Sequence, residues 1–343
     1  MIGGFKILRI LEMRYGIFAR LALAAVAVAL TGGCAELRGL FSDVPGRYEK
    51  WAGLIDETRA FERRIGFAET TNFLQVAEDQ ESFTYCGRAS RLDLPYSYED
   101  PAIRWTHGIS REECVALGRG EDVYFDEAEA LGEIGTPLTR SMLGAPLDRL
   151  LYLVFHEDCH DQFDFSAGIE EALCNVIAYQ AMVGFATEKF GPGSAQHRLV
   201  ASYVEEQSQR SLITRAYYRR LAVLYARYGR KNLTARALLR ERDAVLRLAE
   251  RVLAREKGSL NNVSIATDMT YDRHFPLFLS IHGLLGNNLA RTVSFFKEVD
   301  ARKPAPEQVM KQRRLRDERS VAFIRAYEAA VIETVKTELD SRL

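Results

Sequence analysis

Apolar residues recur three or four positions apart along most of the chain, which is the spacing of one face of an amphipathic helix. In residues 145–163 the stripe consists of Leu147, Leu150, Leu151 and Val154, and the Pro before it suits a helix start. A second helix is expected from about 166 to 190, where Gly-Pro-Gly ends it. Further helices are expected at residues 48–67, 194–229, 233–256, 273–285, 288–299 and 316–341.

The helical period is lost between residues 70 and 135, where Pro, Tyr, Asp and Ser interrupt the chain. Short strands are expected there at 83–86, 103–106 and 123–125, with short helices after Ser110 and at 138–143. Residues 260–271 have no clear pattern, and the basic residues 302–315, with two prolines, predict a linker. The fold class predicted is mainly α, with a small irregular α+β N-terminal part.

These patterns divide the chain into five parts. We expect a leader (1–33), a tether (34–47), the irregular α+β part (48–135), a helical core (136–302) and a C-terminal linker with one helix (303–343).

The first 33 residues have the pattern of an export signal. Scattered basic residues precede the apolar stretch 21–31, which is too short to span a bilayer comfortably. Gly32-Gly33-Cys34 follows, and the run LTGGC resembles a bacterial lipoprotein box, in which Cys34 is lipidated. The alternatives are an ordinary signal peptide or an uncleaved anchor, and Met13 is a possible start. Ala35 resembles the residue found in lipoproteins sent to the outer membrane. A bacterial envelope protein, anchored by lipid and facing the periplasm, is therefore expected.

The charge balance gives no reason to expect a polyanionic partner. The chain has 46 basic and 47 acidic residues, and without the four basic residues and one acid of the leader it has 42 and 46. A net charge near −4 offers no bulk attraction to nucleic acid. We therefore expect no nucleic-acid partner.

The sequence His156-Glu157-Asp158-Cys159-His160 has the form H-E-x-x-H, in which both imidazoles face the same way on a helix. Zn²⁺ prefers such nitrogens, and a catalytic site keeps one position for water. Glu157, beside the first ligand, is the expected general base.

The third ligand is expected from the start of the next helix. Glu171 can return to the metal from that helix, whereas Glu170 is a rival ligand. Acids are also favoured at a helix N-terminus for electrostatic reasons alone. Asn175, one turn beyond Glu171, could accept a hydrogen bond from a ligand imidazole.

The run from Val154 to Gln162, together with Glu171-Ala172, resembles the bacterial putative aminopeptidase family of zinc-dependent lipoproteins, which carry F-H-E-L-A-H-Q and then N-E-A. The resemblance covers about residues 135–300. It implies a gluzincin-like helical zinc peptidase domain with His156, His160 and Glu171 as ligands and Glu157 as base. The chain departs from the family where Asp158 and Cys159 replace Leu and Ala, where Asp161 precedes Gln162, and where Glu170 replaces Asn.

A peptidase also needs a hydrogen-bond donor for the developing oxyanion. Tyr271 and His274 are candidates, because they lie in a segment that resembles the same family. The competing interpretation is an aromatic residue at a helix start and a surface histidine.

The cysteines suit an exported protein. Cys86 and Cys114 lie in the irregular part and can pair, and a contact between Cys159 and Cys174 is possible. A C-x-x-C motif is missing from the sequence, so a structural zinc knot is not supported.

The leading hypothesis is a membrane-anchored zinc peptidase that acts on peptide substrates. The alternative is a non-catalytic envelope lipoprotein in which the metal has a structural or partner-binding role. A third, weaker hypothesis is a helical scaffold in which H-E-x-x-H is accidental.

Overall fold

A computed structural model describes residues 44–342 apart from residues 78 and 132–134, and for residues 44–50 it describes the backbone alone. The predicted leader and Cys34 lie outside the described residues. The chain divides into two units, residues 1–49 and 50–343, and the second unit contains the sheet and nearly all of the helical layer.

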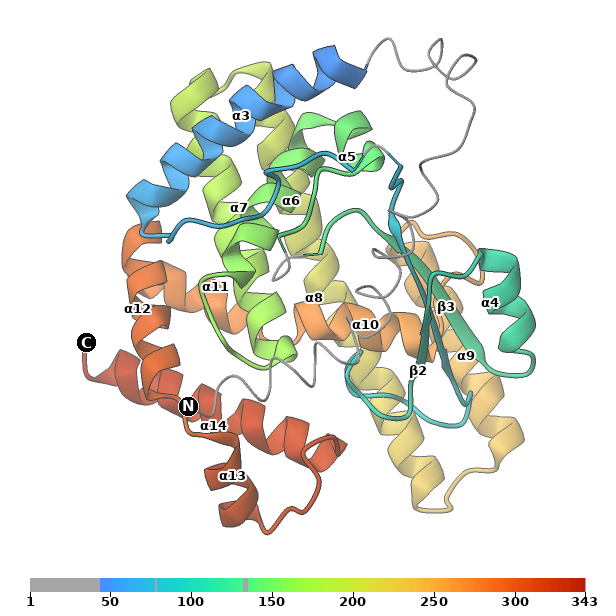
Figure 1. The fold of residues 1–343 in the computed structure, drawn as a ribbon. Coiled ribbons are helices and arrows are strands. Elements are labelled where there is room, and N and C mark those ends of the chain that lie inside the picture. The colour runs from blue at the N-terminus through green and yellow to red at the C-terminus, as the bar shows by residue number, and fades with distance from the viewer. Residues whose placement is uncertain (1–43, 78, 132–134, 343) are drawn as a thin grey trace, which may run out of the picture. The chain divides into compact units, whose positions relative to one another are not determined.

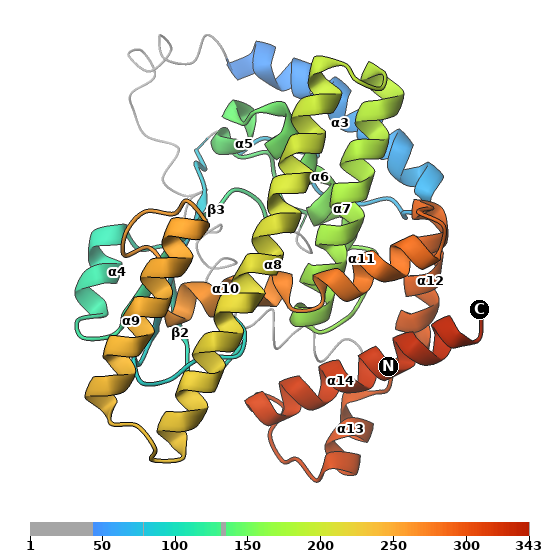
Figure 2. The same cartoon turned by 180° about the vertical axis from the view of Figure 1, so that it is seen from behind.

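The described part of the chain is mainly α-helical, as predicted. Helix α7 packs against α6, α8, α10, α11 and α12, so it is central to the helical layer (Figures 1 and 2). The helices are α3 (Val44–Ile65), α4 (Arg111–Leu117), α5 (Arg140–Gly144), α6 (Leu147–His160), α7 (Ala167–Phe190), α8 (Ala195–Gly229), α9 (Ala235–Val252), α10 (Asn262–Asp272), α11 (Phe275–Leu284), α12 (Leu289–Arg302), α13 (Pro306–Arg313) and α14 (Val321–Asp340).

A three-stranded antiparallel sheet of order β2-β1-β3 forms the small β part, and α10 packs against it. The strands are β1 (Phe83–Ala89), β2 (Arg104–His107) and β3 (Asp122–Ala128). Gly87 lies opposite Trp105, and a Cβ at Gly87 would come within 2.9 Å of both the Trp105 ring and Val263 of α10. Glycine at this position therefore allows the sheet and α10 to approach closely. The expected pairing of Cys86 with Cys114 is confirmed and ties β1 to α4.

Two sequence-based expectations about the C-terminal half need correction. The linker predicted at 302–315 is wrong, because Pro306 occupies the first turn of α13, where a missing N–H costs nothing. Most of residues 260–271, which had no clear pattern, belong to α10 (Asn262–Asp272). Its start is fixed by Asn261, whose side chain accepts from the Ser264 amide while Ser264 accepts from the Asn261 amide. In addition, α3 begins at Val44, before the expected end of the tether.

Within the described part of the chain, none of the helices combines the length and apolarity needed to cross a bilayer.

A buried carboxyl group joins α8 to α10 and makes folding depend on pH. Ser211 donates a hydrogen bond to Asp272, and burial, together with the negative charge of Asp268, raises the pKa of Asp272 to about 7. Below the ordinary pKa near 3.8 both states bind the proton. Between that value and 7 only the folded state holds it, so stability falls as the pH rises through this window.

We expect Asp272→Asn to flatten this dependence, because the amide cannot titrate. The wild type should lose at most about 1.4 kcal/mol of unfolding free energy per pH unit between pH 5 and 7 from this group. Urea denaturation across that range checks the prediction. Parallel curves for wild type and variant would contradict it.

Candidate metal centre

Helices α6 and α7 lie side by side and carry the H-E-x-x-H sequence and the following pair of acids. Part of their shared interface is apolar. Phe155, in the middle of the motif helix, is fully buried and its ring lies edge-on to Phe61 of α3 and Phe185 of α7, with centroids 5.9 and 6.0 Å away. This packing fixes the rotation of α6, and the neighbouring His156 therefore faces α7.

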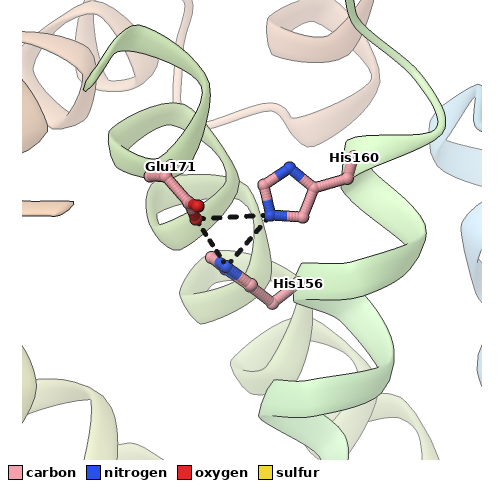
Figure 3. A group of neighbouring side chains, drawn as sticks. All are labelled: His156, His160 and Glu171. Atoms are coloured by element: carbon pink, nitrogen blue, oxygen red, sulfur yellow. Dashed lines mark hydrogen bonds and ion pairs between the residues drawn. The ribbon is translucent and has the colours of Figure 1, made fainter. Parts of the chain in front are cut away.

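Three side chains converge between these helices, as Figure 3 shows. His156 and His160 come from consecutive turns of α6, and Glu171 comes from the first turns of α7. Glu171 Oε2 is 3.1 Å from His156 Nε2 and 3.3 Å from His160 Nε2, and the two Nε2 atoms are 3.3 Å apart. The predicted ligands are thus brought together.

This triangle has the dimensions of one face of a zinc tetrahedron. With zinc–nitrogen and zinc–oxygen bonds of about 2.0–2.1 Å, the ligand atoms of a tetrahedral site lie about 3.3–3.4 Å apart. The observed separations of 3.1–3.3 Å are close to that edge without any rearrangement of the helices. Two imidazole nitrogens and one carboxylate oxygen are also a donor set that zinc accepts. The residues present therefore fit this ion.

Glu170, the rival ligand, has a different position. Its Oε1 lies 2.8 Å from Nδ1 of His160, the ring nitrogen that points away from the triangle, and its Oε2 accepts the Phe165 amide at 2.9 Å. A carboxylate on the outer nitrogen of a histidine ligand fixes the tautomer and the ring orientation. Glu170 therefore orients His160, and Glu171 supplies the oxygen of the triangle.

Burial and neighbouring charges shift the pKa values of His160 and Glu171 in opposite directions. Burial disfavours the charged imidazole, but Glu171 and Glu170 outweigh it and raise the pKa of His160 well above its ordinary value. Burial acts in the opposite direction on Glu171 and would raise its pKa. The neighbouring His160 and His156 outweigh burial and hold the pKa of Glu171 below the ordinary carboxyl range. A metal cation in the triangle would replace the proton on His160 and would supply the positive charge that stabilises the Glu171 carboxylate.

Asn175 does not contact the ligand histidines in the way expected from the sequence. Its Oδ1 accepts the Tyr152 hydroxyl at 2.8 Å, and the Tyr152 ring stacks on His156 with centroids 5.0 Å apart. His156 Nδ1 is buried and has no hydrogen-bond partner among the described residues. His156 is therefore oriented by stacking, and Asn175 acts on it only through Tyr152.

The structure brings one of the two candidate oxyanion donors to the site. The Tyr271 ring lies 6.2 Å from the His156 ring, and burial together with the negative charge of Glu171 raises the pKa of Tyr271 well above its ordinary value. A tyrosine that stays protonated remains a hydrogen-bond donor. His274 instead places Nε2 2.9 Å from Glu328 of α14.

Tyr98 is a residue of the site that sequence reasoning missed. Its hydroxyl donates to Glu171 Oε1 at 3.1 Å, although it belongs to the irregular loop between β1 and β2. The sequence LPYSYEDP around it has no periodic spacing that could have revealed this contact.

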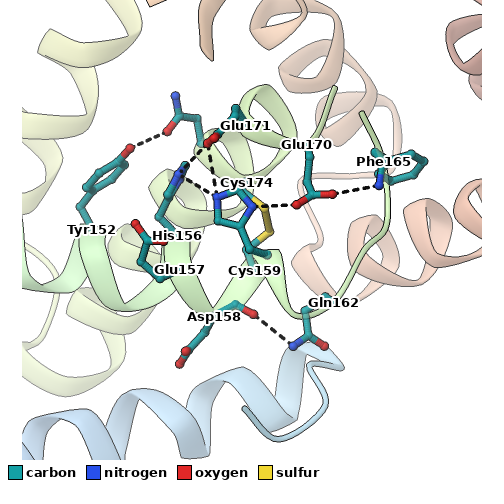
Figure 4. Close-up of a disulfide and its surroundings, with 12 residues drawn as sticks. Tyr152, His156, Glu157, Asp158, Cys159, Gln162, Phe165, Glu170, Glu171 and Cys174 are labelled. Carbon is teal, nitrogen blue, oxygen red and sulfur yellow. Dashed lines mark hydrogen bonds and ion pairs between the residues drawn. A yellow bond between two sulfur atoms is a disulfide. The ribbon is translucent and has the colours of Figure 1, made fainter. Parts of the chain in front are cut away.

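One departure from the family motif, Asp158, lies outside the triangle and pairs with a residue before the sheet. Asp158 is fully buried and accepts a hydrogen bond from Asn72 Nδ2 at 3.0 Å, and burial raises its pKa to about 7. Glu157 is also buried, and its carboxylate lies on the side of His156 in Figure 4.

Cys159 and Cys174 form a disulfide between α6 and α7, so the contact considered from the sequence exists. Its Cα atoms are 5.5 Å apart; Cys159 directly precedes His160, and Cys174 follows Glu171 by one helical turn. The two helices that supply the ligands are therefore joined covalently at the level of the site.

Comparisons with known proteins identify no relative: no family model matches the chain, and no curated protein or solved structure is significantly similar to it.

Proposed function

We propose that the protein is a zinc-dependent peptidase whose ion is held by His156, His160 and Glu171. The single observation that carries the proposal is the convergence of two imidazole nitrogens and one carboxylate oxygen, 3.1–3.3 Å apart, from neighbouring helices. The spacing of the three atoms, which is close to the edge of a zinc tetrahedron, supports the metal site over the scaffold hypothesis.

The number of ligands supports a catalytic role for the ion. Structural zinc sites are closed by four protein ligands, whereas catalytic sites have three and keep one position open. The candidate group found among the described residues has three members. Zinc bound there would supply a Lewis acid that lowers the pKa of a bound water to about 7.

The chain's own residues then have separate roles. Glu157 is the general base, because its carboxylate directly follows the first ligand on the helix and lies on the side of His156 (Figure 4). Tyr271 is the proposed donor to the oxyanion of the peptide carbonyl. Glu170 holds the His160 ring in place, at 2.8 Å from Nδ1.

The resemblance of residues 154–172 to the putative aminopeptidase family supports peptide bonds as the substrate and a gluzincin-like fold. Lipidation of Cys34 and a place in the bacterial envelope, with the enzyme facing the periplasm, belong to the same proposal. The two disulfides agree with an oxidising compartment.

The proposal is tested by measuring zinc content and peptide hydrolysis for wild type, His160→Ala and His282→Ala. His282 is a matched control, because it is also buried but its Nδ1 pairs with Thr292 Oγ1 at 2.8 Å in another part of the fold. We expect one zinc per chain in the wild type and the control, and none in His160→Ala. Equal zinc content in all three proteins would refute the metal site.

The second candidate is a non-catalytic metal-binding lipoprotein. The observation that favours it is burial: His156 and Glu171 are only 3% and 7% exposed. It predicts one zinc per chain and loss of stability on chelation, but no hydrolysis of any member of a peptide library. Turnover by the wild type that chelation abolishes would exclude it.

A further inference from the structure

The two oxygens of Glu171 have different neighbours. Oε2 faces both ligand imidazoles, at 3.1 and 3.3 Å from their Nε2 atoms, whereas Oε1 accepts the Tyr98 hydroxyl at 3.1 Å. A carboxylate can bind a metal ion through one oxygen or through both. A donor on Oε1 competes with the metal for that oxygen and therefore favours binding through Oε2 alone.

Tyr98 is held firmly enough to perform this role. Its backbone amide donates to Thr270 Oγ1 at 3.0 Å, and its carbonyl accepts Trp105 Nε1 at 2.9 Å. Two residues earlier, the Tyr96 hydroxyl donates to the buried carboxylate of Glu328 at 2.6 Å. The loop is thus anchored to α10, β2 and α14, and these anchors set the position of the Tyr98 hydroxyl.

We propose that Tyr98 is a positioning residue that keeps Glu171 a one-oxygen ligand and so preserves the open coordination position. The inference rests on the proposed zinc site of His156, His160 and Glu171. It assigns a role in the site to a residue outside α6 and α7, since Tyr98 belongs to the β1–β2 loop. Without the hydroxyl, Oε1 is free to turn toward the ion as a fifth ligand and to crowd the position that a catalytic site reserves for water.

The test compares Tyr98→Phe with Tyr96→Phe. Both variants remove one hydroxyl from the same loop, and each leaves a buried carboxylate with one hydrogen bond fewer. Glu328 is not a ligand, so Tyr96→Phe controls for any general loosening of the loop. Zinc affinity is measured by competition with a chelator, and the visible absorption of the Co²⁺-substituted protein reports the coordination number.

We expect Tyr98→Phe to lower zinc affinity about ten- to a hundredfold and to weaken the Co²⁺ absorption toward that of a five-coordinate site. Tyr96→Phe should keep wild-type affinity and spectrum, even if its melting temperature falls. If Tyr98→Phe binds zinc as tightly as the wild type and has the same Co²⁺ spectrum, this inference is overturned while the zinc site stands. A wild-type protein that binds neither ion overturns the inference and the proposed function together.

Discussion

Glu157→Gln should lower the kcat for peptide hydrolysis by about 10²- to 10⁴-fold, which is the usual contribution of a general base. The reason is that an amide of nearly the same shape cannot accept the proton. Zinc content should stay at one per chain, because the ligand atoms belong to His156, His160 and Glu171 and the variant leaves them unchanged. The measurement is kcat on a peptide library beside metal analysis of the same preparation.

Glu157→Asp is the matched control for this result. It keeps a carboxylate but withdraws it by one methylene, so hydrolysis should be reduced less than in the glutamine variant. Wild-type rates in Glu157→Gln would show that another group takes the proton. Loss of zinc from the same variant would mean that Glu157 has a structural role.

Removal of the Cys159–Cys174 disulfide, as Cys159→Ala with Cys174→Ala, should lower the free energy of unfolding by about 3 kcal/mol. The cross-link closes a segment with a sequence separation of 15, and its loss gives the unfolded chain more conformations. Zinc affinity should fall in the same variant. The bridge joins the residue before His160 to a residue one turn after Glu171, so it limits how far α6 and α7 can move apart (Figure 4).

The Cys86→Ala, Cys114→Ala variant separates stability from metal binding. That bridge has a sequence separation of 28 and joins β1 to α4, so its loss should cost about 3.5 kcal/mol. It carries none of the ligands, and zinc affinity should remain that of the wild type. Urea denaturation and chelator competition on both double variants give the comparison. Equal losses of zinc affinity in the two would assign the effect to global stability.

Much of the helical layer was determined by local patterns. The apolar stripe of α6 and the Gly-Pro-Gly after α7 gave those helices nearly the observed ends, because periodicity and capping act within a few residues. The rule that prolines mark a linker failed at Pro306, because a proline can occupy the first turn of a helix as well as interrupt one.

The convergence of His156, His160 and Glu171 could also be predicted from the sequence alone, since two histidines four apart must share a face and the acid begins the next helix. Spacing could not separate Glu171 from Glu170. That choice depends on how α7 is rotated against α6, and the packing around Phe155 decides it.

The tertiary structure alone decided which distant residues complete the site. Tyr98 donates a hydrogen bond to Glu171, which lies 73 residues later in the sequence. Asn175 accepts its hydrogen bond from Tyr152 and not from a histidine of the site. His274 pairs with Glu328, 54 positions away. Contacts over such separations follow from how the loop, α10 and α14 pack together, and periodicity within one element carries no information about that packing.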